Sequence, residues 1–74
     1  MKYKTLDTIV LKKDLPQHGL RCGDLGAIVY LQDPDAMEVE FVTASGKTQA
    51  LVTLSSRDVR SVHDSDLVAV RSVA

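Results

Sequence analysis

The sequence predicts an all-β fold: a small five-stranded barrel with a long ordered first loop and a 3₁₀ turn before the last strand. Three observations indicate it. Short runs rich in β-branched and apolar residues recur along the 74-residue chain, separated by turn residues. A loop longer than most connections follows the first run. Four polar residues separate the last two runs, which suits one 3₁₀ turn.

The first expected strand is Thr8–Lys12, because β-branched residues fill most of it. The long loop Lys13–Asp24 follows, and Pro16 within it resists sheet pairing because it has no N–H. Two apolar residues of the loop, Leu15 and Leu20, should point inward. We therefore expect a packed loop rather than a mobile one.

Four more strands are expected before residue 63. The second is apolar on both faces, which favours a central position in the sheet. The third alternates, so that Met37, Val39 and Phe41 would face inward. Glycines that can adopt positive φ occur in the loop and in a hairpin: Gly19, Gly23 and Gly46. The expected strands are Gly26–Gln32, Met37–Thr43, Thr48–Leu54 and Val59–Val62, with the 3₁₀ turn at Ser55–Asp58.

The order of these elements is that of an SH3-like barrel. The alternative is an OB-like barrel, which usually has longer strands and a helix between the third and fourth. Only Ala44–Lys47 lies between those strands here, which disfavours it. We assign residues 1–62 to the barrel and residues 63–74 to a C-terminal extension.

The extension contains an apolar run, Leu67–Val70, for which three conformations stay open: a sixth strand, a helix turn or a tail. We favour an extended segment because valine prefers strands. Four apolar residues exceed what a five-stranded core can bury: Val10, Leu51, Val68 and Val70. Such a surplus indicates a surface for another protein, or a homodimer in which the tail adds a strand to a neighbour's sheet edge.

Composition excludes several classes of protein. Hydrophobic residues make up 45% and charged residues 26%, as in ordinary globular proteins. The net charge of −1 lacks the basic excess of a nucleic-acid binder. The single cysteine, Cys22, allows no internal disulfide. Since neither a signal peptide nor a membrane-spanning run is recognisable, we expect a cytoplasmic protein without membrane or nucleic-acid partners.

The first loop carries the residues closest to a chemical site. His18 and Cys22 lie four positions apart between two aspartates, residue types found in metal and nucleophilic sites. Zinc needs at least three protein ligands and a reactive cysteine needs a base, so we interpret His18 as a surface residue and Cys22 as a half-buried hydrophobe. Asp7, Asp14 and Asp24 could hold a hard cation, but we expect them to cap backbone N–H groups.

The remaining candidates also lack a chemical context. Glu38 and Glu40 lie about 7 Å apart on a strand face that we expect to be solvated, with nothing apolar nearby. The serines have no paired histidine, and His63 is expected in a polar loop. The three aromatic residues are too few for a proline-peptide groove or a base-stacking platform. The serines are Ser45, Ser55, Ser56 and Ser65, and the aromatic residues are Tyr3, Tyr30 and Phe41. We expect no catalytic residue, no cofactor and no metal.

Seven short segments form a recognisable pattern: Leu6-Asp7, Asp14-Leu15-Pro16, His18-Gly19-Leu20, Gly23-Asp24-Leu25-Gly26, Val39–Val42, Thr53-Leu54 and Asp58–Arg60. In these segments the chain resembles a family of short bacterial proteins defined only as a domain of unknown function, number 4926. The resemblance covers roughly residues 6–62, and its glycine and proline positions are the most specific. It implies a small SH3-like barrel and no activity.

The piece Gly23-x-x-Gly26-x-Ile28 also resembles the glycine signature of KOW-type barrels, which occur in ribosomal and transcription proteins. Those domains are commonly basic here, whereas this chain has Asp24. Such a role would use six basic residues as phosphate contacts: Lys12, Lys13, Arg21, Lys47, Arg57 and Arg60. The sequence therefore favours a non-enzymatic protein-interaction module, with a KOW-like RNA- or ribosome-associated domain as the alternative.

Overall fold

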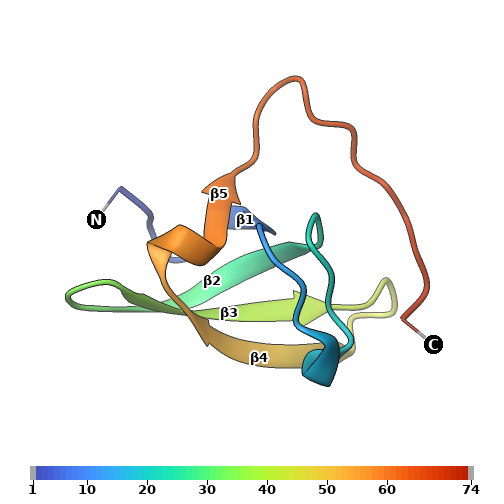
Figure 1. Cartoon of the computed structure of the whole chain (residues 1–74), viewed down its shortest axis with the longest axis horizontal. Coiled ribbons are helices and arrows are strands. Elements are labelled where there is room, and N and C mark those ends of the chain that lie inside the picture. Colours follow the sequence, from blue (N-terminus) through green and yellow to red (C-terminus); the bar gives the residue numbers. More distant parts are fainter. Residues whose placement is uncertain (1, 74) are drawn as a thin grey trace.

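The protein is all-β in its regular structure, as a computed structural model that describes residues 2–73 shows (Figure 1). The strands are β1 (Thr8–Leu11), β2 (Leu25–Gln32), β3 (Ala36–Val42), β4 (Thr48–Leu54) and β5 (Val59–Ser61). Two 3₁₀ turns, η1 (Pro16–His18) and η2 (Ser56–Asp58), lie in the connections. Among the described residues no helix is long and apolar enough to cross a membrane.

All five strands belong to one antiparallel sheet with the order β4-β3-β2-β1-β5. Strands β2, β3 and β4 follow one another as a meander, and β5 returns to pair with β1. Val10 in β1 therefore lies between Leu25 of β2 and Arg60 of β5. The predicted all-β class, the five strands and the central position of β2 are confirmed.

The element boundaries agree with the prediction to within one residue. β1 ends at Leu11 rather than Lys12, and β5 ends at Ser61 rather than Val62. The first loop also contains η1, a 3₁₀ turn that the sequence pattern does not predict. This turn begins at Pro16, where a missing N–H costs little, and ends at Gly19, whose φ is 68°.

The core lies on the inner face of the sheet and extends into the first loop. Met37, Val39 and Phe41 are buried there, as predicted. Leu15 and Leu20 are also buried and form an isolated bridge, so the packed loop is confirmed. Tyr3, before β1, joins the same cluster of buried side chains.

Gly26 occupies the tightest point of this core. It lies opposite Ile9 in the β1–β2 pair and shares its inward face. A Cβ at this position would lie 2.5 Å from Cγ1 of Val39 and 2.8 Å from Cε2 of Phe41. Packing therefore requires this glycine. Positive φ is confirmed at the three glycines for which it is predicted: Gly19, Gly23 and Gly46.

One type of turn occurs four times. In each, an aspartate side chain accepts a hydrogen bond of 2.7–2.9 Å from the main-chain N–H three residues earlier. The N–H of the same aspartate donates to the carbonyl of that earlier residue. Both ends of the turn are thus closed by one residue. The pairs are Lys4 with Asp7, Arg21 with Asp24, Ser55 with Asp58, and His63 with Asp66.

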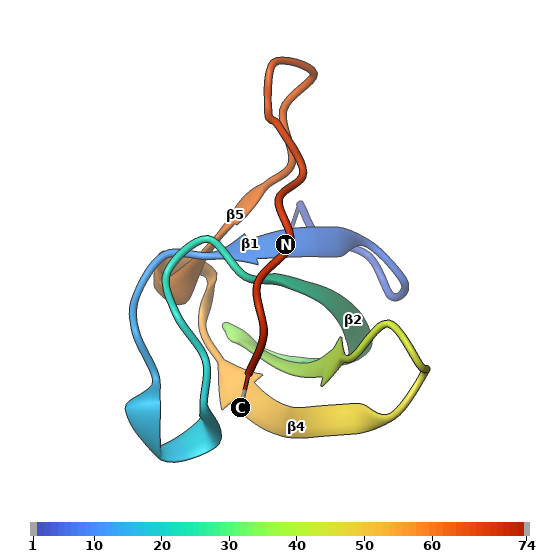
Figure 2. The ribbon, with the colours of Figure 1, turned by 90° about the vertical axis from the view of Figure 1, so that its right-hand side faces the viewer.

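Beyond β5 the chain forms neither helix nor strand up to residue 73. It turns at residues 63–66, arches away from the sheet and returns towards the first loop (Figure 1). In Figure 2 this segment crosses in front of the sheet. The sixth strand considered for the extension is not formed by residues 63–73, and residue 74 lies outside the described part. We refer to residues 63–73 as the strap.

Candidate functional site

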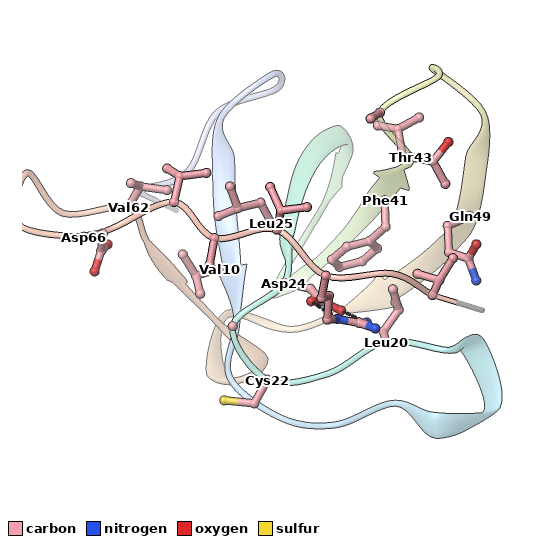
Figure 3. A pocket seen from close by; sticks show the side chains of 18 of the residues that line it. Val10, Leu20, Cys22, Asp24, Leu25, Phe41, Thr43, Gln49, Val62 and Asp66 are labelled. Atoms are coloured by element: carbon pink, nitrogen blue, oxygen red, sulfur yellow. Dashed lines mark hydrogen bonds and ion pairs between the residues drawn. The ribbon is translucent and has the colours of Figure 1, made fainter.

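The strap and the sheet border a groove of about 800 Å³ (Figure 3). Val10, Leu25 and Val62 line it on the side of the sheet, and residues 67–70 line it on the side of the strap. The core residue Phe41 reaches its far end (Figure 3). The volume lies within the range of ordinary binding pockets. This groove is the main candidate site in the described part of the chain.

Two arginine–aspartate pairs fasten the strap to the sheet and the first loop. Arg60 of β5 donates from Nη1 and Nη2 to the carboxylate of Asp66, at 2.9 and 3.1 Å. Arg71 donates from Nε to Oδ1 of Asp24 at 2.9 Å, and from Nη2 to the carbonyl of Gly19 at 2.9 Å. Bidentate pairs of this kind fix orientation as well as distance. All the arginines and aspartates that line the groove are therefore engaged with one another.

The arginines keep both carboxylates ionised. Hydrogen bonds from Arg60 lower the pKa of Asp66 from 3.8 to about 2, and the N–H of His63 acts in the same direction. The hydrogen bond from Arg71 lowers the pKa of Asp24, although partial burial acts against it. Both ion pairs therefore persist well into the acid range.

Between these two attachments the strap leaves its apolar side chains in water. Leu67 is 95% exposed and Val70 is 99% exposed. The backbone of residues 67–70 makes no hydrogen bond to any other described residue. A folded chain rarely holds an apolar segment in this way without a further use, because exposed apolar surface and unpaired strand edges favour association. The strap is therefore an exposed apolar segment that is fixed at both ends.

One prediction about the surplus apolar residues is wrong. Val10 is only 5% exposed. Its side chain does not belong to the core cluster, but it lies directly between Leu25 and Arg60 on neighbouring strands. Directly opposite residues share a face of a sheet, so two long side chains cover the valine. The other three residues are exposed, as predicted: Leu51, Val68 and Val70.

The aspartates around the first loop cap backbone groups, as predicted. Asp7 accepts the N–H of Lys4, Asp24 accepts that of Arg21, and Asp14 accepts that of Cys22 across the loop at 2.8 Å. Within residues 2–73, no three histidine, cysteine, aspartate or glutamate side chains form a metal-binding group.

The interpretations of His18 and Cys22 need correction. Cys22 is exposed rather than half-buried, because the turn fixed by Asp14 directs its thiol away from the core (Figure 3). His18 is half-buried rather than at the surface. The side chain of Gln49 in β4 donates to its carbonyl at 3.2 Å, so this end of the loop is held against the sheet.

The glutamates of β3 face outward, as predicted, but they are half-buried rather than fully solvated. Glu40 accepts a hydrogen bond of 2.6 Å from Oγ1 of Thr48 on the neighbouring strand.

Tyr3 and Phe41 are both buried, which leaves Tyr30 as the exposed aromatic side chain of the chain. A surface for stacking bases would need more such residues.

Two of the six basic residues proposed as phosphate contacts are engaged with carboxylates. Lys13 lies 3.1 Å from Asp58, and Arg60 pairs with Asp66.

Sequence reasoning missed Arg71, the residue that ties the strap to the first loop. Its partner Asp24 lies 47 positions earlier, so no local pattern could have indicated the contact.

A comparison with known families assigns the chain. The family model described as a domain of unknown function, DUF4926, matches residues 5–61, well over half of the 74 residues. The chain belongs to this family, which confirms the resemblance seen in the sequence. No curated protein and no solved structure matches it. The matched residues include all five strands and end before the strap.

Proposed function

We propose that this member of the DUF4926 family is a non-enzymatic protein-interaction module of the bacterial cytoplasm, built as a small SH3-like barrel. The observation that carries the proposal is the strap, a segment that an ion pair fastens at each end and that leaves its apolar side chains exposed. The barrel form is supported by the strand order, in which β5 returns to β1, and by a single core.

The strap is suited to binding because the body of the protein already restricts it. Asp66 and Arg71 hold its two ends, so a partner need not order a free tail. Burying an exposed leucine or valine contributes about 1.5–3 kcal/mol each. Leu67 and Val70 are therefore the side chains from which a partner would gain most.

The groove indicates what kind of surface would fit. Its arginines and aspartates already neutralise one another. A charged group inserted beside them would lose its hydration without gaining a free counter-charge. The proposed partner is therefore a separate protein that presents an apolar, uncharged segment at this place.

Affinity capture from the native lysate tests the proposal. The tagged chain is compared with a strap variant, Leu67→Ser with Val70→Ser, and with a matched control, Leu51→Ser with Tyr30→Ser, which changes exposed apolar residues outside the strap. Each lysate is divided into nuclease-treated and untreated halves. We expect one protein to be retained in both halves by the native chain and the control, and to be lost with the strap variant.

Two other outcomes would contradict the proposal. Equal retention of that protein by the strap variant would show that the strap does not bind it. Capture of ribosomal or nucleic-acid-linked proteins that disappear on nuclease treatment would favour the KOW-like RNA-binding role instead.

A further inference from the structure

We propose that the strap also pairs with the strap of a second copy of this chain, as two antiparallel strands related by a two-fold axis. The pairing rests on the proposed role of the strap as an interaction segment, and it identifies one occupant of that segment. Three features carry it: an unused backbone, exposed apolar side chains and a self-complementary order of residues.

The backbone of residues 67–70 is free to pair. It makes no hydrogen bond within the described chain, so no existing bond must break. Strand edges in natural proteins are usually protected by proline, lysine or an inward charge. The run Leu67-Val68-Ala69-Val70 contains none of these, and valine favours the extended conformation.

Symmetry restricts the register. In an antiparallel pair, hydrogen-bonded and non-hydrogen-bonded residue pairs alternate, so a two-fold axis must pass through one pair, and one residue faces its own copy. With Val68 at the axis, Asp66 would face the second copy's Val70. With Ala69 at the axis, Val68 faces the second copy's Val70, and this β-branched pair occurs twice. We therefore place the axis at Ala69.

The charges at the ends of the strap fit this register. Asp66 faces the second copy's Ser72, and Leu67 faces the second copy's Arg71, whose aliphatic stem can cover it. No like charges lie opposite each other. Each Asp66 and Arg71 keeps its ion pair with its own body, because Arg60 and Asp24 belong to the same copy.

The resulting dimer is weak. A ribbon of a few residues from each copy covers less surface than the roughly 1,200–2,000 Å² of stable complexes. Two-stranded ribbons alone are marginal in water. The straps should therefore pair at high protein concentration and separate on dilution, when they become free for another partner.

Sedimentation equilibrium measures the pairing with the protein alone. From micromolar to millimolar concentration, the average mass of the native chain should rise from 8.1 kDa towards twice that value. The variant Leu67→Ser with Val70→Ser should stay monomeric, and the control Leu51→Ser should behave like the native chain. A native chain that stays monomeric at millimolar concentration overturns the proposal.

Cysteine cross-linking tests the register. In a Cys22→Ser background, Ala69→Cys should form a disulfide between copies, because directly opposite Cα atoms lie about 4.5–5.5 Å apart. Val68→Cys should form little, since in this register it is diagonal to its own copy, roughly 7–8 Å away. Leu51→Cys is the control outside the strap.

Each remaining outcome has a distinct meaning. Faster cross-linking at position 68 than at position 69 overturns the register. A doubled mass with cross-linking only at position 51 places the dimer elsewhere and overturns the pairing of straps. Neither result affects the proposed binding of a separate protein, which is decided by the nuclease-resistant capture.

Discussion

The sheet and the strap are held in place by different forces. The sheet buries the apolar side chains of its inner face, as at Ile9 and Val39, and pairs its backbone along every strand. The strap exposes its apolar side chains, pairs no backbone between residues 67 and 70, and is fastened by two ion pairs. The hydrophobic effect therefore stabilises one region and charge-assisted hydrogen bonds the other. Under the proposed function, folding and binding would therefore fall to separate parts of a very short chain.

A core substitution should have the largest effect on stability of all the tests of this comparison. Phe41→Ala should cost about 3–5 kcal/mol. A domain of this length has only about 4–11 kcal/mol of stability in total, so much of the protein should unfold. Circular dichroism during urea or thermal unfolding measures the loss. Leu51→Ala, an exposed change in β4, is the control and should stay near native. A Phe41→Ala protein with an unchanged midpoint would contradict the assignment of Phe41 to the core.

A second test adds volume to the core instead of removing it. Gly26→Ala should destabilise the sheet by about 1–3 kcal/mol, because the new methyl group meets Val39 and Phe41. Val39→Ala should relieve part of this effect when the two changes are combined. Val39→Ala should not relieve the destabilisation caused by Gly46→Ala. At Gly46 a Cβ would have no neighbouring atom within 4 Å, and the strain comes from a φ of 87°. Strictly additive effects of Gly26→Ala and Val39→Ala would argue against the contact.

Acid should lower the stability of the fold by protonating the ion-paired aspartates. This loss of stability should be smaller than that caused by either core change. The pKa values of Asp24, Asp58 and Asp66 are lowered in the folded protein, to about 2 for Asp66. In acid the unfolded chain therefore binds more protons, so stability is complete above about pH 5 and falls as the pH approaches 2. Urea midpoints measured across this range should fall less steeply in Arg71→Gln than in the native chain. Arg57→Gln is the matched control, and an unchanged slope in Arg71→Gln would contradict the role of the Asp24 pair.

Removal of the strap should have the smallest effect on folding. A chain that ends at Val62 keeps all five strands and every residue of the core cluster. We expect its thermal midpoint to change by no more than a few degrees, while the concentration-dependent rise in mass disappears. A truncated chain that fails to fold would show that the strap belongs to the folding unit.

The sheet could be predicted because its signals are local. Alternation in β3 and the turn residues around it place a strand without knowledge of the rest of the chain. Apolar residues inside a polar loop, such as Leu15 and Leu20, likewise indicate an inward face. The turn η1 was missed because Pro16 indicates a break in the sheet as readily as the start of a 3₁₀ turn.

The strap could not be predicted in the same way. Its conformation depends on Arg71 meeting Asp24, and that contact exists only after the first loop has folded. The burial of Val10 depends on the size of its neighbours across two strands, which alternation within one strand does not contain. The sequence therefore indicates a surplus of apolar residues, but it does not indicate which contacts fix the strap or cover Val10.

The aspartates have a consequence for how this chain tolerates substitution. Six of them accept a main-chain N–H: Asp7, Asp14, Asp24, Asp35, Asp58 and Asp66. Glutamate keeps the charge, but its additional methylene group moves the carboxylate away from the N–H, whereas asparagine keeps the reach. In a saturation mutagenesis experiment, the three positions outside the ion pairs of the described residues, Asp7, Asp14 and Asp35, should accept asparagine more readily than glutamate. At these three positions side-chain length, rather than charge, would then govern which substitutions this chain tolerates.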